Sequence, residues 1–114
     1  TGCHGVLAGH CGIPFARHVG EGLWVNAGAI GMPADDGTPR VWFALLTPEE
    51  RALRVDIRAL HYDHAAAAAA LRAARLPEGY AAALETGLWP SCDVLPEAER
   101  ARRGTPLQDV TLRW

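Results

Sequence analysis

The chain is organised around the stretch Gly9-His10-Cys11-Gly12-Ile13-Pro14-Phe15, which follows the apolar run Val6-Leu7-Ala8. An apolar run that stops at Gly-His is typical of a strand that delivers a histidine to the end of a sheet. Glycines on both sides of His10 allow another group to approach its imidazole closely. We therefore expect a strand over 6–8 and a functional loop directly after it.

A hairpin is expected after this loop. The turn Gly20-Glu21-Gly22 tolerates positive φ, so we expect Phe15–Val19 and Leu23–Asn26 to pair as antiparallel strands. Asn26 is followed by a second glycine-containing loop over 27–33, and the segment Ala34–Pro39 has the composition of a turn-rich loop.

Two longer strands are predicted in the middle of the chain. Arg40–Leu46 is rich in residues that favour sheets. Ala52–Leu60 alternates between apolar and charged residues, which predicts a half-exposed strand antiparallel to the first, with Thr47–Glu50 as the turn between them. Its apolar face would carry Leu53, Val55 and Ile57, and its charged face Arg54, Asp56 and Arg58.

Helices are expected after residue 60. Asp63 is a good N-cap for an alanine-rich helix over His64–Arg75. A second helix is predicted over Pro77–Gly87, and a third over Pro96–Arg103, acidic at its start and basic at its end. The alternation in Val110–Trp114 indicates a short final strand.

Length and composition set the broad class. The 114 residues allow a single domain or part of one, with 1–60 mainly β and 61–114 mainly helical. A net charge of −2 gives no nucleic-acid surface, and no apolar run approaches the roughly 20 residues that cross a membrane. Three cysteines, an odd number without framework spacing, favour reduced thiols and a cytoplasmic protein.

The order of the glycine and histidine motifs resembles the C-terminal half of the calcineurin-like metallophosphoesterases. The matching residues are Gly9-His10-x-x-Ile13-Pro14-Phe15, a hairpin, and Asn26-x-Gly28-x-x-Gly31, and the match runs through Leu46, about forty residues. The later stretch Leu84–Ser91 is similar to the tail of one bacterial branch of this family. The resemblance implies an α/β fold: the C-terminal half of a two-sheet αββα sandwich, strands first and helices afterwards.

The same resemblance implies a phosphatase-type hydrolase that cleaves phosphomonoester or phosphodiester bonds with two divalent metal ions (Mn, Fe, Zn or Ni). His10 would be a metal ligand. Asn26 would contact the phosphoester substrate, or else order the following loop through an Asx turn. If the segment is extended, residues i and i+2 point the same way, so His10 would face the metals and Cys11 would point away.

Two departures from the family pattern limit this expectation. Gly12 replaces the family's second histidine, and Ala27 and Ala29 stand where proline and serine are usual. The family's Asp-x-His, Gly-Asp and Gly-Asn-His motifs precede the matching region, and this sequence has no carboxylate before Glu21. We therefore expect the chain to be inactive alone and to need an N-terminal half or a second chain.

Other functional hypotheses remain open. The chain could be a non-catalytic remnant or a partner-binding subunit. The spacing Cys11-x5-Arg17 matches that of cysteine-dependent phosphatases, although Pro14 removes an amide from the phosphate-binding loop and no helix is predicted after Arg17. Cys3, His4, His10 and Cys11 could form a zinc cluster, but their spacing is not that of a known zinc motif.

Two expectations concern packing. Val6–Ala8 is apolar on both faces, which predicts a strand inside a sheet; without its neighbours it would be an association site. The large aromatic residues Trp24, Trp42 and Trp89 are expected in the core.

Overall fold

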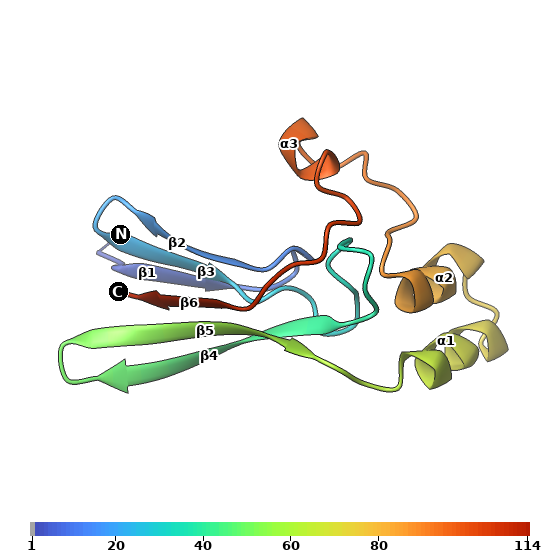
Figure 1. Cartoon of the computed structure of the whole chain (residues 1–114), viewed down its shortest axis with the longest axis horizontal. Helices are drawn as coiled ribbons and strands as arrows, with labels where there is room; N and C mark the ends of the chain where they lie inside the picture. Colours follow the sequence, from blue (N-terminus) through green and yellow to red (C-terminus); the bar gives the residue numbers. More distant parts are fainter. Residues whose placement is uncertain (1) are drawn as a thin grey trace.

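The computed structural model describes residues 2–114 and has a mixed α/β architecture, as the sequence predicts. Two three-stranded sheets lie face to face at one end of the elongated molecule, and two helices lie at the other (Figure 1). The elements in chain order are β1 (Gly5–Ala8), β2 (Phe15–Val19), β3 (Gly22–Asn26), β4 (Val41–Glu49), β5 (Ala52–Leu60), α1 (His64–Ala73), α2 (Glu78–Thr86), α3 (Glu97–Arg100) and β6 (Val110–Arg113).

The first sheet has the strand order β1-β3-β2. β2 and β3 form the predicted antiparallel hairpin, with Val19 opposite Gly22 and the intervening Gly20 at φ 60°. β1 pairs with the other side of β3 in parallel, from Gly5 opposite Leu23 to Ala8 opposite Asn26. The parallel pair brings the carboxyl ends of β1 and β3 to the same edge of the sheet.

The second sheet has the order β4-β5-β6, and both pairings are antiparallel. The predicted strands in the middle of the chain and at its end are confirmed. The expected turn at Thr47–Glu50 is partly wrong, because β4 continues to Glu49 and Pro48 pairs with Leu53. Proline is tolerated there since β4 is an edge strand of this sheet.

The core lies between the two sheets. Leu23 and Val25 of β3 pack against Val55 of β5, while Trp42 and Ile57 form a second cluster toward the loops. Because side chains alternate along a strand, the charged residues of β5 face outward, as predicted. Trp42 and Trp89 are buried as expected, but the prediction for Trp24 is wrong: it is 38% exposed on the outer face.

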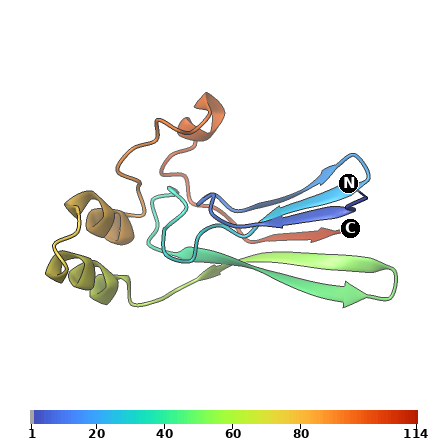
Figure 2. The same ribbon diagram turned by 180° about the vertical axis from the view of Figure 1, so that it is seen from behind.

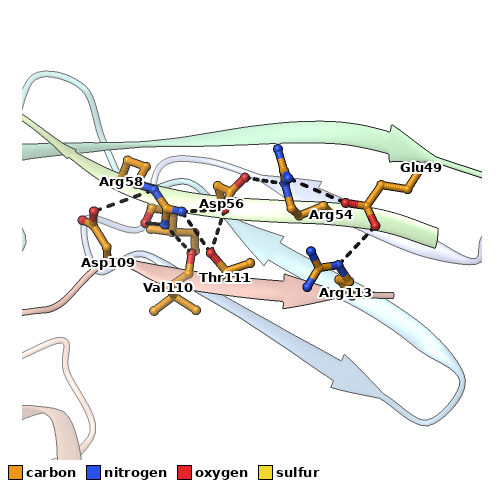
Figure 3. Close-up of polar contacts among 9 residues, drawn as sticks. Glu49, Arg54, Asp56, Arg58, Asp109, Val110, Thr111 and Arg113 are labelled. Carbon is orange, nitrogen blue, oxygen red and sulfur yellow. Dashed lines mark hydrogen bonds and ion pairs between the residues drawn. The ribbon is translucent and has the colours of Figure 1, made fainter.

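A network of charges covers the outer face of β5 and β6 (Figure 3). Asp56 accepts hydrogen bonds from Arg54 Nε at 3.0 Å, Arg58 Nη2 at 2.6 Å and Thr111 Oγ1 at 2.7 Å. The bond from Thr111, followed by the charges of the two arginines, holds the pKa of Asp56 below its usual value against the opposing effect of burial. These contacts tie β6 to β5 through side chains as well as through the backbone ladder.

β1 lies at the edge of its sheet, with β3 as its one neighbour among the described strands, so the expectation of an apolar strand with an unpaired edge is confirmed. Val6 is 48% exposed and Leu7 64% exposed. Leu7 is opposite Val25, whose side chain is buried in the core, yet nothing in the described part of the chain covers Leu7 in the same way. The strand therefore presents apolar side chains to solvent, as expected for a strand that lacks a neighbour.

α1 and α2 form a helical hairpin away from the sheets (Figures 1 and 2). Its interface is small, since it is built from Ala68, Ala81 and Leu84. The predicted N-cap is confirmed, because the Asp63 carboxylate accepts a hydrogen bond from the Ala66 amide at 2.9 Å. Gly87 ends α2 in the left-handed conformation at φ 73° and lies against the backbone of Thr38.

Arg72 on α1 joins both helices of this hairpin through exposed ion pairs. Its guanidinium reaches Glu78 at 2.6 Å and Glu85 at 2.8 Å. The hydrogen bonds from Arg72 are the main reason that the pKa values of both glutamates lie below their usual range.

The third predicted helix is much shorter than expected. α3 covers Glu97–Arg100, and the residues up to Gly104 form turns rather than the predicted helix to Arg103. None of the residues of α3 is buried, so no apolar face stabilises a longer helix. Among residues 2–114, no helix is both long and apolar enough to span a membrane.

Candidate functional site

Two loops leave the sheet side by side at the carboxyl ends of β1 and β3. The backbone amide of Ala27, just after β3, donates to the carbonyl of Ala8, the last residue of β1, at 3.0 Å. The first loop carries His10 and the second spans 27–33. Loops at the carboxyl ends of adjacent parallel strands are a common place for functional side chains.

The loop after β1 is not extended. His10 has a left-handed backbone with φ 72°, and the Cys11 amide donates to the Gly9 carbonyl at 2.9 Å. The prediction that residues 10 and 12 point one way and residue 11 the other is therefore wrong, because it requires an extended segment. His10 and Cys11 are both exposed, and both border the same hollow.

Asn26 fixes this loop through side-chain hydrogen bonds. Its side chain is 1% exposed, and its Nδ2 donates to the carbonyls of Cys11 at 2.8 Å and Ile13 at 2.7 Å. The Asx turn expected in the loop after Asn26 is thus replaced by bonds to the loop before β2. Both amide hydrogens are in use, so Asn26 shapes the His10 loop; a contact with substrate stays a prediction.

A cavity of about 510 Å³ opens beside His10. Its volume is within the range of small-molecule sites. Most of its wall is apolar, and the polar side chains come from the His10 loop, from α2 and from the segment after it. The lining residues are His10, Cys11, Gly12, Met32, Tyr80, Trp89, Pro90, Ser91, Val94, Leu95 and Pro96.

Asp35 anchors the segment that carries Trp89, one of the residues that line this cavity. It is 3% exposed, has φ 58°, and accepts a hydrogen bond from the Trp89 amide at 2.7 Å. The Cys92 thiol donates to the same carboxylate at 3.1 Å, and Arg103 lies 3.4 Å away. Burial, then the bond to Asp35, raises the pKa of Cys92, which therefore stays a thiol and makes a poor nucleophile.

The neighbouring Asp36 fixes the segment that follows the turns after α3. It is 2% exposed and accepts from the Leu107 amide at 3.0 Å and from Arg40 at 3.1 Å. The segment Ala34–Pro39 is the loop that its composition predicts, and three of its residues are buried. Its two aspartates attach the C-terminal third of the chain to the sheets.

Cys11 and Arg17 do not form a phosphate cradle. Arg17 lies over the rings of Phe15 and Trp24, with its Cζ at 4.9 and 5.5 Å from their centroids. β2 begins at Phe15, so a strand stands where a cysteine-dependent phosphatase has its anion-binding helix. Cys11 and Arg17 do border one hollow, of about 600 Å³, on the α3 side of this loop.

The described chain does not contain a complete metal centre. Within residues 2–114, no group of three or more histidine, cysteine, aspartate or glutamate side chains could hold an ion, which includes the zinc cluster considered at Cys3, His4, His10 and Cys11. His10 contributes one exposed imidazole, a suitable ligand for Mn, Fe, Zn or Ni. The residues therefore fit one ligand of a metal site and not the whole set.

Comparison with known proteins adds no family assignment: no protein-family model, curated protein or solved structure matches this chain.

Sequence reasoning missed the residues that shape the site from a distance. Trp89 was expected as a core residue, and Asp35 as part of a turn. Gly12 is the residue that points to them. It stands where the resembled pattern has a histidine ring, and the space that the ring would fill must be taken by another side chain.

Proposed function

We propose that this chain provides the His10 side of a dinuclear metal site in a phosphoesterase that hydrolyses phosphomonoester or phosphodiester bonds. The observation that carries the proposal is the position of His10. It is exposed in a glycine-flanked loop at the carboxyl end of β1, beside the loop after β3 and a cavity of about 510 Å³. The motif order that resembles metallophosphoesterases supports the same reading.

The chain's own residues have defined tasks in this proposal. His10 offers an imidazole nitrogen, Asn26 fixes the loop that carries it, and the apolar wall of the cavity lowers the local water content. When bound, two divalent ions supply Lewis acidity and a hydroxide nucleophile. Further ligands must come from a segment or subunit outside the described residues, since His10 alone cannot hold two ions.

The proposal predicts that His10→Ala lowers metal content and activity together. The experiment uses the protein at its natural length, Mn²⁺ as the metal and bis(p-nitrophenyl) phosphate as the substrate. We expect turnover to fall by at least about 100-fold, the upper end of what outer-shell changes cause. His18→Ala, which removes an exposed histidine of β2, is the matched control and should change neither quantity.

Two further measurements separate the alternatives. Cys11→Ser should leave activity largely intact; an inactive variant with metal still bound would instead favour the thiolate mechanism. The 114-residue chain alone should not hydrolyse the substrate. Turnover by this chain that a chelator abolishes would contradict the need for additional ligands.

A partner-binding subunit without catalysis is the second candidate. The exposed edge of β1 favours it, because an apolar strand with a free edge can pair with a strand of another chain. Under this alternative, the protein at its natural length binds no stoichiometric metal and His10→Ala has no effect on either measurement.

A further inference from the structure

Trp89 occupies the space that a side chain at position 12 would need. A Cβ atom added to Gly12 would overlap Cζ2 of the indole and would lie 3.2 and 3.3 Å from Cη2 and Cε2. The backbone of Gly12 itself is ordinary, since its φ is not positive. Glycine is therefore required at this position by the neighbouring ring and not by the conformation of the turn.

Trp89 is held too firmly to give way easily. Its side chain is 8% exposed, and its indole Nε1 donates to the Pro33 carbonyl at 2.7 Å. Its backbone amide donates to Asp35, and its carbonyl accepts from Arg103 Nη2 at 2.8 Å. A side chain at position 12 would have to displace a ring that is held by one hydrogen bond of its own and by two bonds to the backbone of the same residue.

The His10 loop is consequently held by contacts with two other segments of the chain. Asn26 binds the carbonyls of Cys11 and Ile13, on either side of Gly12, while the Trp89 ring lies against the α-carbon between them. These contacts come from β3 and from the segment after α2, which are distant in the sequence. His10 is two residues from the point where they meet.

We propose that Trp89 is a positioning residue for His10: its ring takes the place of the side chain that Gly12 lacks and fixes the loop that presents the imidazole. The packing part of this inference is independent of the proposed function. The part that concerns metal affinity rests on it.

Thermal unfolding of the 114-residue chain tests the packing. Gly12→Ala should lower Tm by about 4 °C or more, because overpacking a fixed ring is destabilising. Gly9→Ala adds the same methyl group on the other side of His10, where the closest atom is the Gly28 carbonyl oxygen at 3.7 Å, and should shift Tm by less than about 2 °C. In a Trp89→Leu background, Gly12→Ala should cost less than about 1 °C, because the clashing ring atom is gone.

Equilibrium dialysis against Mn²⁺, with the protein at its natural length, tests the positioning. Gly12→Ala and Trp89→Leu should each weaken Mn²⁺ binding about tenfold, as loss of a group that orients a ligand does. His18→Ala, which removes an exposed side chain of β2, should leave the affinity unchanged.

The outcomes are distinguishable. If Gly12→Ala lowers Tm by the same amount in the wild-type chain and in the Trp89→Leu chain, the inferred packing of Trp89 against position 12 is overturned. If Gly12→Ala alone does not fold, recovery of folding in the Gly12→Ala/Trp89→Leu chain supports the packing, and failure of that chain where Trp89→Leu folds overturns it. If the Tm effects of Gly12→Ala and Trp89→Leu depend on each other but neither variant changes the Mn²⁺ affinity, Trp89 is a packing residue and the positioning role is overturned. Absence of Mn²⁺ binding by the unsubstituted protein would refute the proposed function and the positioning role with it, while the packing result would stand.

Discussion

β5 and β1 are both rich in apolar residues, yet their surroundings are opposite. β5 has a neighbour on each side, its Val55 and Ile57 are at most 1% exposed, and its other face carries a charge network (Figure 3). β1 has one neighbour among the described strands, and Leu7 is 64% exposed. The same kind of residue is therefore buried or exposed according to the strands that lie beside it.

The largest expected contrast between the two strands is in unfolding free energy. Ile57→Ala should cost about 2–5 kcal/mol, because it empties a fully buried site. Leu7→Ala should change stability by no more than about 0.5 kcal/mol, as an exposed substitution does. Urea denaturation of the two variants measures both. A loss of several kcal/mol at Leu7 in the monomeric chain would mean that β1 is covered by other residues of the same chain, against its exposed position in the fold.

The next contrast is in association. The chain should self-associate through β1, or travel with a partner that covers it, since a free apolar edge pairs readily. Leu7→Lys should shift the isolated chain toward monomer in sedimentation velocity. Val94→Lys removes an 88% exposed apolar residue that belongs to no strand, and should leave the sedimentation coefficient as it was. A wild-type monomer whose β1 amides resist hydrogen exchange would show that the sheet closes by itself.

The smallest contrast concerns pH and touches β5 alone. The pKa of Asp56 is lower in the folded chain than in the unfolded chain, chiefly through Thr111, so the carboxylate stabilises the fold above its unfolded pKa near 3.8. This contribution is lost as pH falls through the lower folded value. The difference in Tm between wild type and Asp56→Asn should therefore shrink as pH drops from 5 to below about 3.8.

The sequence was a good guide where the pattern is local. The alternation of Ala52–Leu60 predicts both faces of β5, and Asp63 and Gly87 mark real helix ends. These signals depend on side-chain periodicity and on capping within a few residues, which the sequence displays directly.

The sequence was a poor guide where distant segments meet. Asp35 and Asp36 have the composition of a turn but are buried by residues from the end of the chain. The turn at His10 follows from bonds to Asn26 and from the ring of Trp89, and neither is visible in the spacing of Gly9–Phe15. Of the candidate site, the position of His10 at the end of a strand was predictable, whereas the cavity beside it was not.

The attachment of α1 to α2 should depend on ionic strength, because a single arginine of α1 makes the ion pairs with α2. The pairs of Arg72 with Glu78 and Glu85 are exposed, and the alanine interface beneath them is thin. Salt shortens the range of such charges, from about 10 Å at 0.1 M to about 3 Å at 1 M, while it leaves apolar contacts in place. Concentrated salt should thus weaken the attachment of α1 to α2 more than the apolar core between the sheets, while it also screens the exposed ion pairs on the outer face of β5 and β6.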